Sequence, residues 1–158
     1  MDALRLLQQD HQEASILMNR IKADYGRADG VARGQMFEQL KAALTLHARV
    51  EELHVYQVFQ QSEVTRDDAA RALDDHRIIK ELLEVLGRMP PSGFQWVNKF
   101  NELYDRAMRH MKMEEEELFG HAGEVFTRQE AEELGTKVEV AKKEIQGAAP
   151  GPAGGIPD

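Results

Sequence analysis

Apolar residues recur three and four positions apart along most of this chain, and this spacing limits the fold more than any other feature. It is the spacing of one face of an α-helix, whereas the alternation typical of strands is weak. The pattern predicts five helices, over roughly residues 2–25, 31–61, 66–89, 93–119 and 127–146. The third and fifth follow TRDD and TRQE, which are typical of capping boxes. Residues 147–158, rich in Gly, Pro and Ala, are predicted to be disordered.

Each of the first four predicted helices has one apolar stripe, and polar residues interrupt every stripe. These residues are His11 in the first helix, His47, Glu51 and His54 in the second, His76 in the third, and His110, Glu114 and Glu117 in the fourth. Stripes of this kind pack helices into bundles at shallow angles. The adjacent Glu115 and Glu116 fall outside the stripe, and we interpret them as a solvated face.

The short connections between the helices predict how the stripes meet. Successive helices joined by short turns run antiparallel. Folding the chain back near Asp29, Ser62 and Gly93 brings all four stripe histidines, His11, His47, His76 and His110, to one level. We therefore predict an all-α fold, an up-down-up-down four-helix bundle over residues 1–120. Residues 127–146 would form an accessory C-terminal helix.

The polar residues predicted at that level have the chemistry of a metal site. His47 and Glu51 are four residues apart and share one helix face, as do His110 and Glu114. Two carboxylates buried close together would be costly, by several kcal/mol per ion. Two cations remove that cost, since carboxylates can bridge them and imidazoles can complete each side. Mixed N/O ligation in a bundle suits iron or manganese, with zinc as a further occupant.

The same motifs occur twice along the chain. DH at Asp10-His11 precedes HARVEE, which begins at His47, and DH at Asp75-His76 precedes HMKMEE, which begins at His110. The two H-x-x-x-E motifs and the two DH motifs, in this order, resemble the hemerythrin-like HHE cation-binding domains. The resemblance covers helices one to four. It implies a hemerythrin-like bundle whose six ligands, listed in helix order, are His11, His47, Glu51, His76, His110 and Glu114. It further implies two non-haem iron ions joined by an oxo or hydroxo bridge.

One position departs from the oxygen-carrying members of that family. Those proteins have a further histidine one turn after the ligand of the third helix, where this chain has Lys80. The four-His, two-Glu set is more similar to bacterial proteins of iron-centre repair and of nitric oxide or peroxide stress. The resemblance therefore implies binding of, or reaction with, O2, NO or peroxide. The alternatives are iron storage or donation, and a di-iron enzyme that breaks down peroxide or reduces NO.

Residues beside the predicted ligands suggest how small molecules reach them. Ala14, Leu44, Ile79 and Ala107 form the neighbouring layer, which is predicted to be a pocket for a small ligand. On the other side, His54 and Glu117 occupy equivalent places in the two repeats. We predict that they form a polar route for protons or iron. Lys80 is a further candidate beside the site, and we interpret Tyr56 as a packing residue.

Composition excludes several other functions. The formal charge of −8 argues against binding to nucleic acid or an anionic membrane surface. The chain has no cysteine, so thiolate ligands and disulfides are excluded, and no apolar run is long enough to span a membrane. We expect a cytoplasmic monomer or weak dimer. Its expected partners are a diatomic ligand or peroxide, with a reductase or an iron acceptor.

Overall fold

The computed structural model describes residues 1–148, and they are helical almost throughout. The elements are α1 (Ala3–Ala23), α2 (Val31–Val50), η1 (Glu51–Val55), α3 (Tyr56–Gln60), α4 (Arg66–Gly87), α5 (Phe94–Met113), η2 (Glu114–Leu118), η3 (Phe119–Glu124) and α6 (Arg128–Ala148). η1 and η2 are π-helical turns, and η3 is a 3₁₀-helix. Because η1 joins α2 directly to α3, the five predicted helices are all present, and the predicted all-α fold is confirmed.

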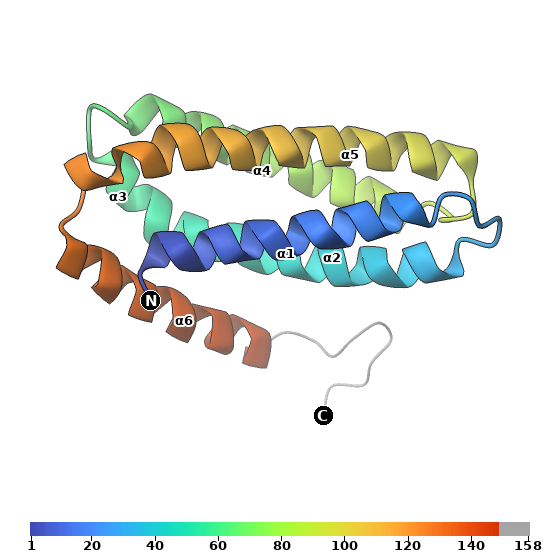
Figure 1. Cartoon of the computed structure of the whole chain (residues 1–158), viewed down its shortest axis with the longest axis horizontal. Coiled ribbons are helices and arrows are strands. Elements are labelled where there is room, and N and C mark those ends of the chain that lie inside the picture. Colours follow the sequence, from blue (N-terminus) through green and yellow to red (C-terminus); the bar gives the residue numbers. More distant parts are fainter. Residues whose placement is uncertain (149–158) are drawn as a thin grey trace.

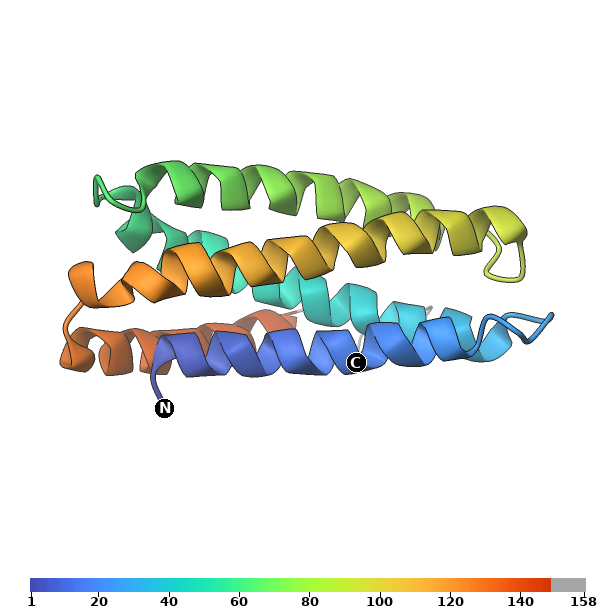
Figure 2. The ribbon, with the colours of Figure 1, turned by 45° about the horizontal axis from the view of Figure 1, so that its top comes forward.

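The helices α1, α2, α4 and α5 lie side by side in the predicted up-down-up-down order (Figure 1). α1 packs against α2, and α4 packs against α5. The turns after α1 and α4 meet at one end of the bundle, and η1, η2 and η3 lie at the other end (Figures 1 and 2). The arrangement brings the middle of α1 and α4 level with the last turns of α2 and α5.

Local sequence explains where several helices begin. Asp2 caps α1 by accepting a hydrogen bond from the Arg5 backbone at 2.9 Å. The TRQE motif forms the predicted capping box, with reciprocal hydrogen bonds between Thr127 and Glu130. The capping-box interpretation of TRDD was wrong. The Thr65 hydroxyl instead donates to the carbonyl of Phe59 at 2.6 Å, which ties the start of α4 to the end of α3.

Two apolar clusters fill the bundle, one on each side of the level of the histidines. The cluster at the turn end includes stacked Trp96 and Phe100, whose ring centroids lie 5.1 Å apart. The cluster at the η end includes Tyr56, Phe59 and Phe119. Because apolar packing encloses the polar level from both ends, side chains placed there are removed from bulk water.

A buried arginine joins the two turns at the far end of the bundle. Arg33 is 2% exposed, and its guanidinium donates to the carbonyls of Asp24, Arg27 and Pro91. The first two carbonyls belong to the turn after α1, and the third belongs to the turn after α4. These contacts hold the two helical hairpins at a defined relative height.

α6 leans on the first hairpin. It contacts α1, α2 and η1, and Figures 1 and 2 show it beside the start of α1. The contact is close at Gly135, where a methyl group would collide with the backbone of Met1. α6 continues to Ala148, two residues past the predicted end, and the rest of the tail predicted over 147–158 lies outside the described residues. Within residues 1–148, no helix is long and apolar enough to cross a membrane.

Candidate metal centre

The structure brings the six predicted ligand residues together in the middle of the bundle. All are buried, and Glu51 and Glu114 have no exposed surface. They form two overlapping groups in which the ligand atoms all lie within 4.8 Å of one another. One group is His11, His47, Glu51 and Glu114, and the other is Glu51, His76, His110 and Glu114. The two groups share both carboxylates, which is the arrangement that bridging ligands require.

The inward ring nitrogens and carboxylate oxygens of these residues face a common space, and several of them do not hydrogen-bond to one another. Nε2 of His11 lies 3.1 Å from Glu114, and Nε2 of His47 lies 3.0 Å from Glu51. Despite these short distances, both nitrogens lack the geometry of a hydrogen bond. The same holds for His110 Nε2 and for one oxygen each of Glu51 and Glu114. Buried polar atoms without partners are rare, and here a cation would satisfy them. The donors present therefore fit a pair of metal ions.

Each histidine is oriented by a carboxylate on its other ring nitrogen. Nδ1 of His47 hydrogen-bonds to Asp10 at 2.8 Å, and Nδ1 of His110 hydrogen-bonds to Asp75 at 3.1 Å. The remaining two pairs are His11 with Glu115 at 2.7 Å and His76 with Glu52 at 2.8 Å. A carboxylate that holds Nδ1–H leaves Nε2 free to bind a metal and makes it more basic.

Sequence reasoning missed these four carboxylates. The DH motifs give no role to Asp10 and Asp75, and the spacing along the fourth helix predicts that Glu115 is solvated. That interpretation was wrong, because Glu115 bonds to His11 although its side chain is 39% exposed. The signal was present in the repeat: each candidate ligand Glu51 and Glu114 is followed by a second glutamate, and each DH histidine is preceded by an aspartate.

The π-helical turns explain why the inward stripe changes register after Glu51 and Glu114. In η1 the backbone N–H of Tyr56 bonds to the carbonyl of Glu51, five residues earlier. In η2 the N–H of Phe119 bonds in the same way to Glu114. The extra residue in each turn places residues five apart on the same face. π-helical turns of this kind are frequent at functional sites.

This change of register alters the placement expected for His54 and Glu117. Val55 and Leu118 occupy the buried positions, so His54 is only half-buried and Glu117 is exposed. The expected inward placement of Glu117 was therefore wrong, because regular α-helical spacing was extended past a turn with one more residue. A role for His54 and Glu117 as a route for protons or iron stays a prediction.

The π-helical turn η1 places the Tyr56 side chain at the site. The interpretation of Tyr56 as a packing residue was therefore incomplete. The side chain is buried, and its hydroxyl lies 3.0 Å from His76 Nε2 and 3.2 Å from Glu51 Oε1. It also contacts Glu114 Oε2. Burial, together with the charges of Glu51 and Glu114, raises the pKa of Tyr56 well above its ordinary value. The hydroxyl therefore belongs to the polar centre and not to the apolar cluster around it.

The carboxylates hold protons on the facing histidines. Burial opposes the charged form of His47, but Glu51 and the hydrogen bond to Asp10 raise its pKa to about 10. Burial likewise opposes charge on His110, and Asp75 and Glu114 raise its pKa to about 10. Burial disfavours the charged form of Glu51, yet His47 and His76 lower its pKa. Without a metal, His47 and His110 therefore carry protons that a cation must displace in order to bind.

Cavities connect the centre with the outside. One of about 150 Å³ is lined by all four histidines and by three of the predicted pocket residues, Leu44, Ile79 and Ala107. Lys80 also lines it, although its side chain is largely exposed. A second cavity is lined by Ala14, the remaining predicted pocket residue, with Leu44, His11 and His47. A third, more open cavity is lined by His11, Met108 and Met111.

The fold and these donors define an all-α bundle with a candidate dimetal site. Residues 2–122 match the hemerythrin HHE cation-binding domain, and the chain belongs to this family. It resembles the crystal structure of an HHE domain-containing protein, the Rv2633c homolog from Mycobacterium kansasii. That match has a TM-score of 0.81 and 25% identity, and covers 94% of this chain and 89% of the other.

A curated relative is a protein named DNA nickase from Nostoc sp. (strain PCC 7120). The two sequences are 27% identical over 150 residues, which is 95% of this chain. The matched region is 42% of the relative, so the chain spans less than half of that protein's length.

Proposed function

We propose that this protein holds two non-haem iron ions, joined by an oxo or hydroxo bridge, and reacts with O2, NO or peroxide during oxidative or nitrosative stress. The proposed ligands are His11, His47, Glu51, His76, His110 and Glu114, and manganese or zinc would be substitutes. The observation that carries the proposal is the sharing of Glu51 and Glu114 between two groups whose buried donor atoms lack hydrogen-bond partners.

The donor set supports iron or manganese. Imidazole suits iron, zinc and copper, while carboxylate oxygen is a harder ligand, and the combination in a helical bundle is typical of redox-active iron or manganese. When bound, the metal pair supplies Lewis acidity and electrons for a small oxidant. The histidines are held in place from behind by four carboxylates, so the donors are positioned before any metal arrives.

The surroundings of the centre support a small reactant. The four histidines line a cavity of about 150 Å³, which has room for a diatomic molecule or peroxide. Leu44, Ile79 and Ala107 make part of its wall apolar, and the charged residues Arg49, Glu52 and Lys80 line another part. The two apolar clusters keep bulk water from the centre at both ends of the bundle.

The name of the Nostoc relative suggests DNA cleavage as a different function. Two observations favour the small-molecule reaction. The six candidate ligands are at most 7% exposed, so a phosphodiester could not reach them without rearrangement of the bundle. The formal charge of −8 also opposes association with DNA. A supercoiled-plasmid nicking assay with the iron-loaded protein should give no more cleavage than the metal-free protein.

The deciding experiment is anaerobic loading with ferrous iron, followed by separate exposure to O2, NO and hydrogen peroxide. We expect two irons per chain and an optical change that requires iron. A stable adduct without turnover would identify a binding protein, and repeated oxygen evolution from peroxide would identify an enzyme. Rapid transfer of iron to an apo-acceptor would identify a donor. A folded protein that takes up no iron would overturn the proposal.

Matched variants separate the site from the acidic surface beside it. Glu114→Ala removes a shared carboxylate, whereas Glu116→Ala removes an exposed one two residues away. Iron content should fall sharply in the first variant and stay at two per chain in the second. Equal loss in both would show that iron binds to the acidic surface and not to the buried centre.

A further inference from the structure

The cavity that reaches all four candidate histidines opens between two helices that carry cations there. Its lining includes Thr45 and Arg49 from α2, and Ile79 and Lys80 from α4. Ile79 is buried, whereas the other three residues are exposed. The exposed residues therefore mark where this cavity of about 150 Å³ meets solvent. We call Thr45, Arg49 and Lys80 the α2–α4 mouth.

Both cations of the mouth lie beside an acid that is already occupied. Glu52 also lines the cavity, and its carboxylate hydrogen-bonds to Nδ1 of His76 at 2.8 Å. That hydrogen bond lowers the pKa of Glu52, and the nearby charges of Lys80 and Arg49 lower it further. Within residues 1–148, neither Arg49 nor Lys80 has a carboxylate partner within 4.0 Å. Their charges are therefore available to an anion that comes from solvent.

The other two cavities have different charges at their walls. Asp10 and Glu13 line the cavity between α1 and α2, so acids predominate there. Lys112 and Glu115 line the cavity between α1 and α5, where one cation accompanies one acid. Among these three cavities, positive side chains outnumber acids at the α2–α4 mouth alone. Positive charge at a mouth raises the local concentration of small anions, even on a chain whose formal charge is −8.

We propose that small anions reach the candidate centre through the α2–α4 mouth, and that Arg49 and Lys80 select them. This inference rests on the proposed function and narrows its reactants, because neutral O2 and NO gain no Coulomb attraction from the two cations. Superoxide and peroxynitrite are anions of the class that the mouth would take. The Thr45 hydroxyl adds a hydrogen-bond donor to the two charges.

The first test needs no metal. Backbone amide signals of the ¹⁵N-labelled, metal-free protein are followed by NMR during titration with nitrite at low ionic strength. Saturable shifts are expected at Thr45, Arg49 and Lys80. In Arg49→Gln/Lys80→Gln, half-saturation at Thr45 should require about tenfold more nitrite, since both attracting charges are gone. Equal nitrite affinity in the two proteins would overturn the inference.

The second test separates charge from shape in the iron-loaded protein. Azide is the anionic probe for the ferric protein, and NO is the neutral probe for the ferrous protein, each followed by stopped-flow absorbance. In Arg49→Gln/Lys80→Gln, azide association should slow about tenfold at low ionic strength, while NO association should change by less than about twofold. Added salt should slow azide binding to the wild-type protein and have little effect on the double variant.

Matched variants assign the slowing to the mouth. Lys80→Gln alone should slow azide association, whereas Lys112→Gln, which removes the same charge at the cavity between α1 and α5, should not. Arg49→Lys/Lys80→Arg keeps both charges and should retain the wild-type rate. Equal slowing of azide and NO, or equal slowing in Lys80→Gln and Lys112→Gln, would overturn the inference. A folded protein that binds no iron would overturn the proposed function instead, and the nitrite titration would still test the mouth.

Discussion

The first hairpin consists of α1, α2 and η1, and the second consists of α4, α5 and η2. The two hairpins supply equivalent candidate ligands, but the residues around those ligands differ. Each supplies two histidines, one shared glutamate and a π-helical turn. In each, an aspartate of the first helix orients a histidine of the second. The comparison teaches that the internal repeat accounts for the candidate ligands, while the residues beside them differ between the two hairpins.

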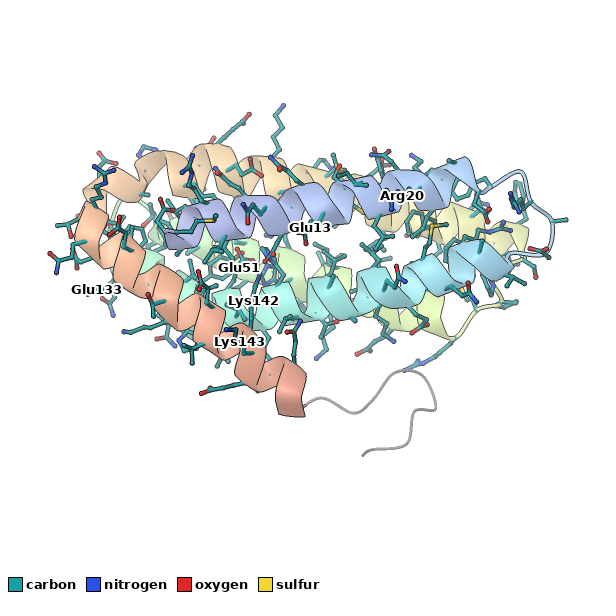
Figure 3. The ribbon with its side chains drawn as sticks, turned by 60° about the horizontal axis from the view of Figure 1, so that its bottom comes forward. Glu13, Arg20, Glu51, Glu133, Lys142 and Lys143 are labelled. Atoms are coloured by element: carbon teal, nitrogen blue, oxygen red, sulfur yellow. The ribbon has the colours of Figure 1, made fainter. Side chains whose placement is uncertain are left out.

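The hairpins differ in the residue that follows the shared glutamate by five positions, which is Tyr56 in the first and Phe119 in the second, and in two further contacts. Asp10 pairs with Lys142 of α6, whose nitrogen lies 2.6 Å from both carboxylate oxygens. Its counterpart Asp75 pairs with Arg106 of α5 at 3.5 Å. Figure 3 shows Lys142 on α6 beside the part of the bundle that contains Glu51. The cation that pairs with the aspartate therefore comes from α6 in the first hairpin and from α5 in the second.

The largest effect should come from the carboxylates that both metal positions share. Glu51→Ala should remove both metals and lower the free energy of unfolding of the metal-loaded protein by on the order of 3–5 kcal/mol. Metal content and the melting temperature should fall together, as they should for His110→Ala. If Glu51→Ala kept one full metal per chain, the carboxylate would belong to a single position, and the hairpins would be less equivalent than their geometry indicates.

The pH dependence of the metal-free protein should be alike for the two hairpins. The pKa of both His47 and His110 is about 10 in the folded protein, above the ordinary value of 6.5. Their contribution to stability is therefore complete below pH 6.5 and is lost as pH rises through about 10. The melting temperature of metal-free protein should fall over that range, as measured by circular dichroism.

Metal loading tests the same protons in another way. Because His47 and His110 are protonated at pH 7.5 without metal, loading with Zn²⁺ should release protons. A pH indicator in weak buffer would measure the release, and His47→Gln and His110→Gln should reduce it by similar amounts. A reduction in only one variant would break the equivalence of the hairpins.

The carboxylates that hydrogen-bond to Nδ1 of the histidines should affect metal binding less than the shared glutamates do. Asp10→Asn and Asp75→Asn each keep the shape of the side chain but remove the charge that orients a histidine. Loss of such a partner weakens metal affinity by about 10- to 100-fold. Competition with a chelator would measure the affinity, and the exposed Asp74→Asn, adjacent to Asp75, is a matched control. Full affinity in both variants would show that Glu51 and Glu114 position the histidines without help.

The smallest effect should come from the ion pair with α6. Lys142→Met keeps the length of the side chain but removes one of the two partners that favour the charge on Asp10, the other being His47, while burial opposes that charge. The pair is partly exposed, so the cost in unfolding free energy should be about 1 kcal/mol or less. Lys143→Met, on an exposed neighbour, should change nothing measurable in chemical denaturation. A larger loss in Lys142→Met than in Asp10→Asn would show that α6 stabilises the first hairpin by another route.

Periodicity allowed most of the fold and the candidate site to be predicted. The stripes of α1, α2, α4 and α5 were predictable because burial of one helical face requires apolar residues three and four apart. Short connections then place the middle of each helix at one height, which is why His11, His47, His76 and His110 were predicted together. The prediction failed after Glu51 and Glu114, because no α-helical pattern anticipates one added residue in a π-helical turn.

The sequence by itself therefore determined which helices form and which six polar side chains their buried faces carry. Only the tertiary structure decided the partners of those side chains: Asp10 for His47, Asp75 for His110, Glu115 for His11, Glu52 for His76, and Tyr56 at the shared carboxylates. The physical reason is that helix formation and burial depend on spacing along one segment. A hydrogen bond between helices depends on their relative rotation and height, which packing of the whole bundle sets.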